Sequence, residues 1–497
     1  MTLDEKLYLN GINGATGEYL VPPMDLAQLE EMLTGRAAPG RAGGAPEDDD
    51  PNDPSQMSWL RRLWHSISQP HLGLPLDVNP EDVRESGWAV VFSSDEDQAV
   101  KDALAPLVEH RRRQIGDDSK VKVLEYRGGE SRARWLARHG VGAGSVEPSK
   151  VPFYLLVVGD PSKIPFVFIH HIDVEYCVGC LHFDTAGEYQ RYVESLIAYE
   201  NGQARPRSRE AVFFGTRHPF DKATQLSADH LVNPLAGGAS GPEGGAGAAA
   251  EWGFQTRKIW GDAARKEALA GVFGPGAGAA RPAFLFTASH GMGFPPNDPK
   301  QPKAQGALVC QDWPGFGSIG PEHYFAADDV PGAGDVHGLI AFCFACFGAG
   351  TPARDRFLHR PGTPPPAIAP KPFFSPLPKR LLTHPNGGAL AWIGHVERAW
   401  GYSIVTPNAG AQLLPFRNAV GRILTGQPVG YAMKDLNERY AALSTSLSSM
   451  LEEKDFGVPV SNFELAAAWV ERNDAEGYVV FGDPAVQLRV SDLAAAT

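Results

Sequence analysis

The stretch AFLFTASHG (283–291) is an apolar run that ends in Ser-His-Gly, and LIAFCFAC (339–346) is a second apolar run that ends in cysteine. Short apolar runs that alternate with helical stretches are typical of buried strands in a parallel sheet. Open α/β sheets bind their ligands at the carboxyl ends of such strands. We therefore expect His290 and Cys346 to lie at the same edge of one sheet.

The chain on both sides of these runs repeats the same alternation from Gly87 onward. Further strands are expected at 88–94, 120–126, 153–159, 211–215, 254–260, 389–395 and 479–482. Helices that connect parallel strands cover both faces of the sheet. The predicted fold class is therefore α/β, with a mostly parallel sheet and helices on both faces. A Gly-Asp-Pro turn that follows a strand at 159–161 and again at 482–484 indicates two related halves.

The N-terminal region has a different composition from the rest of the chain. Residues 36–58 are mainly Gly, Pro, Ala and Asp, so burial would not repay the entropy lost on ordering, and we expect a flexible linker. It follows an arm (1–35) whose Asn-Gly and Thr-Gly steps predict a hairpin or an extended segment that docks on the main body. After the linker we expect an N-terminal α/β subdomain (59–210) and a catalytic subdomain (211–497).

Composition excludes some classes of function. The 497 residues are 43% hydrophobic and 21% charged, as in a globular protein, and the net charge of −13 argues against a nucleic-acid partner. The sequence has no run of eighteen apolar residues and no pattern typical of a secretory signal, so we expect a cytoplasmic protein without a membrane partner. Five cysteines are too few for a disulfide framework in a chain of this length.

A thiol beside an imidazole predicts nucleophilic catalysis. The thiol attacks a carbonyl carbon as the thiolate, and a neighbouring histidine removes its proton. Glycine after the histidine lets its backbone N–H approach a substrate closely, so the N–H groups of Gly291 and Cys346 are candidates for an oxyanion hole. Taken singly, a histidine or a strand cysteine is more often a packing residue; the joint placement favours catalysis by Cys346 and His290.

Metal binding is the competing interpretation of the cysteines. Cys177 and Cys180 form one C-x-x-C pair, and Cys343 and Cys346 form another, a pattern that also occurs in zinc sites. Residues i and i+3 of an extended strand point to opposite faces, and neither pair lies in a glycine-rich turn. We therefore predict no metal site.

The chain from about 87 to 490 resembles the gingipain family, cysteine peptidases of the caspase-like clan. Beyond the His-Gly and Ala-Cys pairs, the likeness depends on YLLVVGDPSKIPF (154–166), GGALAWIGHVERAW (387–400) and YVVFGDPAVQLRV (478–490). The resemblance implies a caspase-like sandwich, no cofactor, and hydrolysis of protein or peptide substrates through an acyl-enzyme on Cys346. It also implies that a regulatory partner protein controls the activity.

The sequence departs from the gingipain pattern around the expected site. Residues 293–317 are longer than the family equivalent, and we interpret them as an inserted loop over the site. The family has an acid that orients the histidine, and here the resemblance places His218 or Arg217 at that position. Residues aligned with the specificity (S1) pocket are Gln225, Cys343, Arg398 and Trp400, with Asp221 and Asp229 near the first of them. A basic residue before the cleaved bond would lack a carboxylate partner, so we expect an acidic or neutral one.

The same residues are compatible with two other functions. A caspase-like scaffold could bind a peptide without cutting it, and a transpeptidase or ligase could resolve the same acyl-enzyme with an amine. The arm is also a candidate inhibitory segment, released by cleavage within 36–58 if the enzyme accepts acidic residues, because that linker contains an Asp run.

Overall fold

A computed structural model describes residues 6–25, 28–29, 73–237, 248–274, 281–355, 357, 364–406 and 410–495. The predicted linker (36–58) lies outside the described residues. No helix in the described part of the chain is long and apolar enough to cross a membrane.

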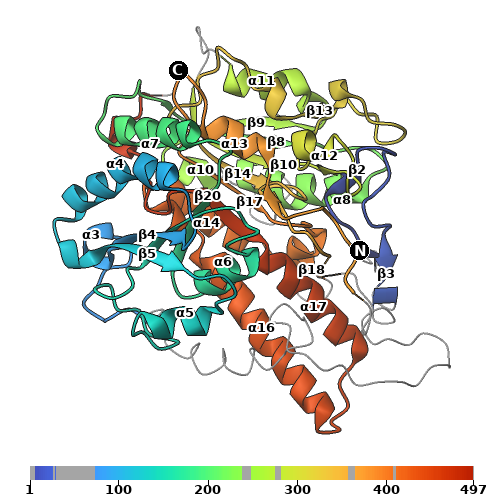
Figure 1. The fold of residues 1–497 in the computed structure, drawn as a ribbon. Coiled ribbons are helices and arrows are strands. Elements are labelled where there is room, and N and C mark those ends of the chain that lie inside the picture. The colour runs from blue at the N-terminus through green and yellow to red at the C-terminus, as the bar shows by residue number, and fades with distance from the viewer. Residues whose placement is uncertain are drawn as a thin grey trace.

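A ten-stranded sheet runs through the centre of the molecule (Figure 1). Its order is β5 (Val121–Tyr126), β4 (Trp88–Ser93), β6 (Tyr154–Val158), β7 (Cys177–Leu181), β20 (Tyr478–Gly482), β17 (Ala391–His395), β14 (Ile340–Phe344), β10 (Pro282–Ala288), β8 (Ser208–Gly215) and β9 (Gln255–Trp260). Most of these strands are buried along their whole length, which explains why they appear in the sequence as continuous apolar runs. The predicted mostly parallel α/β sheet is confirmed.

The sheet consists of two parallel halves that meet at one antiparallel pair, β17 and β20. Five strands lie on either side of this junction, and all the other neighbouring pairs are parallel. Strand β20 comes from the C-terminal end of the chain but pairs with β7 of the N-terminal half. The predicted boundary at 210/211 falls inside β8. Both predicted subdomains contribute strands to the same sheet.

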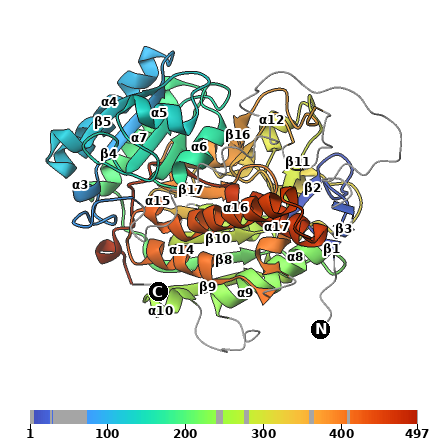
Figure 2. The same ribbon diagram turned by 90° about the horizontal axis from the view of Figure 1, so that it is seen from below.

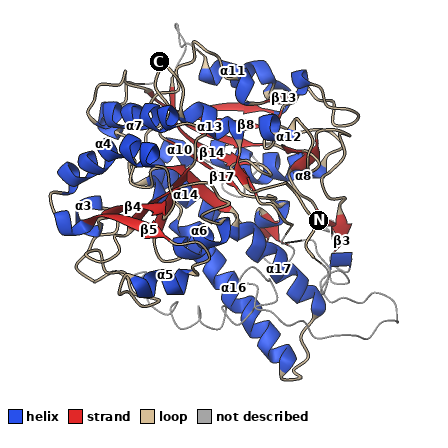
Figure 3. Ribbon diagram, in the orientation of Figure 1, coloured by secondary structure: helices blue, strands red, loops and turns tan. Residues whose placement is uncertain are grey.

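Helices lie on both faces of the sheet (Figures 2 and 3). In chain order they are α3 (Val83–Ser86), α4 (Gln98–Ile115), α5 (Arg132–Arg138), α6 (Phe166–Asp173), α7 (Ala186–Glu200), α8 (Lys222–Ser227), α9 (Asn233–Ala236), α10 (Ala248–Glu251), α11 (Lys266–Phe273), α12 (Gln301–Ala304), α13 (Pro376–Leu382), α14 (Leu414–Leu424), α15 (Val429–Ala432), α16 (Lys434–Asp455) and α17 (Asn462–Glu476). Strand β7 and several helices, among them α6, α7, α14 and α17, were not predicted from the sequence. Cys177 and Gly179 interrupt the aliphatic run at β7, which weakened its strand signal.

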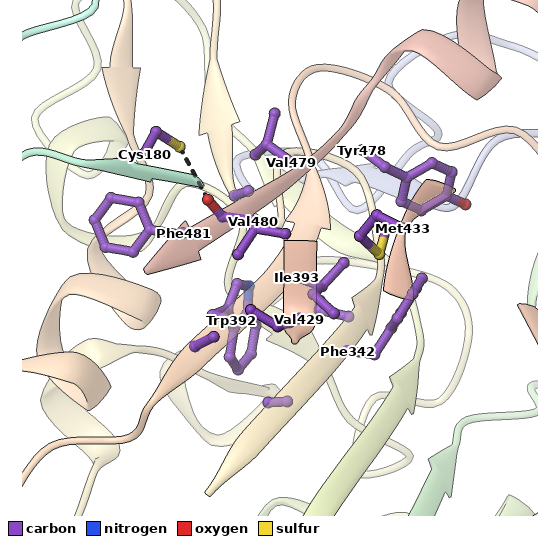
Figure 4. Packing of buried hydrophobic residues seen from close by; sticks show 14 of the residues in the cluster. Cys180, Phe342, Trp392, Ile393, Val429, Met433, Tyr478, Val479, Val480 and Phe481 are labelled. Atoms are coloured by element: carbon purple, nitrogen blue, oxygen red, sulfur yellow. Dashed lines mark hydrogen bonds between the residues drawn. The ribbon is translucent and has the colours of Figure 1, made fainter. Parts of the chain in front are cut away.

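The hydrophobic core is continuous across the junction of the two halves (Figure 4). Phe342, Trp392 and Phe481 are buried side chains from three different strands. The indole N–H of Trp392 also donates a hydrogen bond to the carbonyl oxygen of Gly348 at 2.9 Å, which ties the core to the turn after Cys346. On β7, the Cys180 thiol donates to the carbonyl oxygen of Val480 at 3.3 Å. Among the described residues, no three His, Cys, Asp or Glu side chains are grouped so as to hold a metal ion.

The N-terminal arm docks on a second, smaller sheet. Its order is β13 (Tyr324–Phe325), β12 (Leu308–Val309), β11 (Gly291–Gly293) and β2 (Gly11–Asn13). Arm residue Ile12 is buried in a satellite core that includes Met292 and Trp313. Figures 1 and 2 both show the blue N-terminal segment against this side of the molecule. The segment 293–317, predicted to be an inserted loop, supplies β12 and α12 of this layer.

Short two-stranded pairs complete the structure. They are β1 (Lys6–Leu7) with β3 (Met24–Asp25), β15 (Gly350–Thr351) with β16 (Phe373–Phe374), and β18 (Val405–Thr406) with β19 (Gly410–Ala411). The first of these pairs folds the arm back on itself, so that residues 8–23 form a closed loop against the main body.

Candidate active site

His290 and Cys346 follow two neighbouring strands that are in register. Strands β10 and β14 pair in parallel and end at Ala288 and Phe344, which lie opposite each other. Each of the two candidate residues lies two positions beyond the end of its strand. Both side chains are fully buried. A Cβ built on Gly291 would lie 1.8 Å from the carbonyl oxygen of Cys346. The two segments are therefore in direct backbone contact, and only glycine fits at position 291.

The imidazole of His290 is held by a carboxylate. Its Nε2 bonds to Oδ2 of Asp221, the N-cap residue of α8. The carboxylate also accepts hydrogen bonds from the hydroxyls of Tyr19 and Thr224. Burial acts to raise the pKa of Asp221, but His290 and these hydrogen bonds outweigh it and hold the pKa well below its usual range. A carboxylate that stays ionised fixes the orientation and tautomer of the ring.

The other ring nitrogen of His290 is unoccupied. Nδ1 is buried and makes no hydrogen bond within the described part of the chain. Because Asp221 takes Nε2, a proton leaving or reaching the imidazole would pass through Nδ1. This division of roles between the two nitrogens is what a general acid/base requires.

In the structure, neither His218 nor Arg217 orients the histidine, contrary to the prediction. Both nitrogens of His218 lack a hydrogen-bond partner among the described residues, and its ring instead contacts Trp313 edge-on at 5.2 Å. Arg217 pairs with Asp229 at 2.9 Å at the surface. The side chain that bonds His290 is Asp221, three residues beyond His218. His218 lies near His290, and both rings contact Trp313, but only the carboxylate of Asp221 at the helix N-terminus bonds to the imidazole.

The thiol of Cys346 is enclosed. The backbone N–H of Ala399 donates to its Sγ at 3.2 Å. Burial raises the pKa of the Cys346 thiol, and the hydrogen bond from Ala399 only partly offsets this. With the arm in place, burial therefore favours the neutral form of the thiol.

Two backbone donors beside the thiol converge on one oxygen. The N–H of Gly291 donates to the carbonyl oxygen of Asn10 at 2.8 Å, and the N–H of Cys346 donates to the same oxygen at 3.0 Å. These are the two groups predicted to form an oxyanion hole. Two N–H groups aimed at one carbonyl oxygen next to a thiol form the arrangement that stabilises a tetrahedral intermediate of acyl transfer.

The turn after Cys346 holds a strained backbone. Phe347 has φ of 56°, a left-handed conformation that is unusual for a bulky residue. Its carbonyl oxygen accepts from the hydroxyl of Ser375, and its N–H donates to the carbonyl oxygen of Glu397 at 2.6 Å. This turn directly follows Cys346, a candidate oxyanion-hole donor, and these hydrogen bonds hold the strained backbone in place.

The residues predicted to line the S1 pocket are dispersed. Gln225 donates to the carbonyl oxygens of His218 and Pro219, near the N-terminal end of α8. The Cys343 sulfur packs against Gly348, inside the sheet. Arg398 is buried in ion pairs with Asp355 and Glu397, at 2.8 and 2.9 Å, and Trp400 forms a bridge with Leu9 of the arm. The charge of Arg398 is thus already neutralised by two carboxylates. Arg398 therefore does not support the expectation of an acidic residue before the cleaved bond.

Asp221 and Asn10 were not predicted as site residues. Asp221 was considered only as a neighbour of Gln225, although it follows strand 211–215 and begins a helix, as an N-cap does. The Asn-Gly step at Asn10 was interpreted only as a turn. Asp221 follows strand 211–215, so the rule that ligands bind beyond the carboxyl ends of strands would have indicated it as a site residue. No sequence pattern places Asn10 beside Cys346.

His218 makes folding sensitive to acid. Burial, with nearby His290 as a smaller cause, lowers the pKa of His218 to about 4, whereas the unfolded chain has the ordinary value of about 6.5. The unfolded state binds more protons between these values, so stability falls as the pH falls from about 6.5 to about 4. We expect His218→Phe to remove about 2–3 kcal/mol of the loss in unfolding free energy between pH 7 and pH 4.5. Urea denaturation at the two pH values measures this, and an equal loss in the variant and the wild type would contradict it.

Comparison with known proteins does not assign a family. No family model matches the sequence, and no curated protein matches it either. One solved structure, named "Structure of Protease", aligns over 81% of this chain and 78% of its own, with 12% sequence identity and a TM-score of 0.43. A likeness at this level carries no argument about function, and the resemblance to gingipains remains a prediction.

Proposed function

We propose that this protein is a cysteine endopeptidase with a Cys346–His290–Asp221 triad. The observation that carries the proposal is the convergence of the Gly291 and Cys346 N–H groups on a peptide carbonyl oxygen, directly beside the thiol. A structural cysteine does not require two backbone donors that converge on one carbonyl oxygen at its side, whereas acyl transfer does. The buried His290–Asp221 pair supplies the acid/base part.

Each group has one task in the proposed reaction. His290 accepts the thiol proton, and Cys346 Sγ attacks the carbonyl carbon of the bound peptide. The two N–H groups stabilise the charge that develops on the carbonyl oxygen. His290 then gives the proton to the leaving amine, and water, activated by the same imidazole, hydrolyses the thioester. Asp221 keeps the ring oriented and stabilises the imidazolium.

A peptide library from a denatured proteome tests this function. The library is incubated with the wild type, with Cys346→Ala and with Cys310→Ala, and the new termini are sequenced. Cys310 is a second buried cysteine of the described structure, so its variant controls for removal of a thiol elsewhere. We expect new termini with the wild type and Cys310→Ala, and none with Cys346→Ala.

The same experiment separates the competing functions. A peptide-binding scaffold without activity would give no new termini with any of the three proteins, and that result would overturn the proposal. A transpeptidase or ligase would give new peptide junctions in place of free carboxyl termini. The observation that favours a silent scaffold is the complete burial of Cys346, because a second peptide can reach the thiol only after the arm has left.

A further inference from the structure

The N-terminal arm lies in the candidate active site as an extended strand. The N–H of Asn10 donates to the carbonyl oxygen of Ala399, and the N–H of Gly401 donates to that of Tyr8, both at 2.9 Å. Leu9 and Trp400 form the antiparallel bridge between these two bonds. Addition of an extended peptide to an exposed strand is a common mode of peptide recognition. Residues 8–10 are bound in this mode.

The bond between Asn10 and Gly11 lies at the thiol. The Asn10 carbonyl oxygen is the common acceptor of the two oxyanion-hole donors. On the other side of the bond, a Cβ built on Gly11 would lie 2.7 Å from Sγ of Cys346. The contact leaves no room for a side chain at position 11. The carbonyl group that the donors bind therefore belongs to the peptide bond that precedes Gly11, the residue packed against the nucleophile.

The Asn10 side chain occupies a closed, neutral pocket. It is fully buried, and its Nδ2 donates to Oγ of Ser227 at 3.1 Å and to the carbonyl oxygen of Ser289 at 3.4 Å. Oδ1 makes no hydrogen bond to the described residues. Helix α8 begins after Asp221 and ends at Ser227, so the same helix places the acid of the triad and one wall of this pocket. A pocket that offers acceptors recognises a carboxamide, which has N–H donors, and disfavours a carboxylate, which has none.

Both sides of the bond remain tethered to the enzyme. The carbonyl oxygen of Gly11 accepts from the N–H of Leu20 at 3.1 Å, and β2 pairs with β11. Tyr19 bonds to Asp221, so the arm contacts the triad itself. On the other side, β1 pairs with β3. A cut at this bond would leave both fragments bound under native conditions, and detection requires denaturation.

From this geometry we propose that the arm is the first substrate of the enzyme: Cys346 cleaves the Asn10–Gly11 bond, and the site selects asparagine before the cut and glycine after it. The proposal rests on the peptidase function proposed above. It names a neutral residue before the cleaved bond, one of the two classes expected from the sequence. It moves the self-processing position from the predicted linker (36–58) to the arm.

The proposed cleavage needs water as its only co-reactant. The C–S bond forms between Asn10 and Cys346 as the peptide C–N bond breaks, and the Gly11 nitrogen takes the proton that leaves the thiol through His290. Water then cleaves the thioester, which gives an Asn10 carboxylate and restores the thiol. After the cut, residues 1–10 are held only by noncovalent contacts, and their slow dissociation uncovers Cys346 and the pocket for a second peptide.

Denaturing mass spectrometry of the full-length chain after incubation tests this proposal. We expect the wild type to yield a fragment of residues 1–10 and a new N-terminus at Gly11, whereas Cys346→Ala stays intact. Asn10→Asp is expected to slow the cut at least ~100-fold, because a carboxylate cannot donate to the pocket acceptors. Asn13→Ala is the matched control: Asn13–Gly14 is the same dipeptide three residues on, and its loss should leave the cut unchanged.

A peptide added in trans keeps the test independent of folding of the variants. A synthetic peptide of residues 6–13 is supplied to the wild type with either Asn or Asp at position 10, and only the Asn form should be cut. Equal rates for both forms would overturn the proposed pocket. Library cleavage without a cut at Asn10–Gly11 would overturn the self-processing but keep the peptidase function. No cleavage of arm, peptide or library would overturn both.

Discussion

Asp221→Asn is expected to lower the turnover number for peptide cleavage by about 10³–10⁴-fold, the size of effect that loss of the orienting acid has in serine peptidase triads. The bond from the carboxylate to Nε2 leaves Nδ1 of His290 for proton transfer, and a carboxamide neither enforces this tautomer nor stabilises the imidazolium. KM should change little, because Asp221 bonds to His290 and not to the Asn10 side chain. Steady-state kinetics on a cleaved peptide measures both constants.

The fold should survive this substitution. Asn is as good an N-cap as Asp, so α8 keeps the bond from the N–H of Ala223. Asp229→Asn is the matched control, because Asp229 lies in the same region but pairs with Arg217 at the surface. A surface pair of this kind contributes little to stability, and the control should cleave at the wild-type rate. A loss of less than tenfold in Asp221→Asn would remove this residue from the triad.

Gly291→Ala is expected to reduce cleavage by about 10²–10³-fold or more, the effect of losing one oxyanion donor. The added methyl group would lie 1.8 Å from the carbonyl oxygen of Cys346 and 2.9 Å from its nitrogen. Both atoms belong to the backbone, so the two segments must move apart and both donors lose their common acceptor. The reduction should appear in the turnover number, because these hydrogen bonds strengthen in the transition state.

Gly271→Ala provides the control for this substitution. A Cβ at Gly271, in helix α11, would meet no atom within 4 Å. Alanine is also the better helix former, so this variant should be at least as stable as the wild type and equally active. If Gly291→Ala cleaved peptide at more than a tenth of the wild-type rate, the N–H of Gly291 would not be an oxyanion donor. Thermal unfolding of both variants shows whether the fold is retained.

The central sheet could be predicted from local patterns. Strands such as 283–288 and 339–345 are buried on both faces, so their apolar runs are visible in the sequence. The order of the strands in the sheet could not be predicted from these local patterns. Strand β20 enters between β7 and β17 from the far end of the chain and makes the only antiparallel pair of the ten-stranded sheet. Such a pairing depends on long-range packing, and no local pattern encodes it.

The sequence by itself determined the positions of His290, Gly291 and Cys346, because the end of a buried strand is a local property. It did not determine the acid or the bound arm. The His290–Asp221 contact spans 69 positions of the chain, and the contact between Asn10 and Ser227 spans 217. Only the packing of α8 and the docking of the arm bring these groups to the thiol. The tertiary structure therefore decided what lies beside the thiol: the Asn10–Gly11 peptide bond of its own chain.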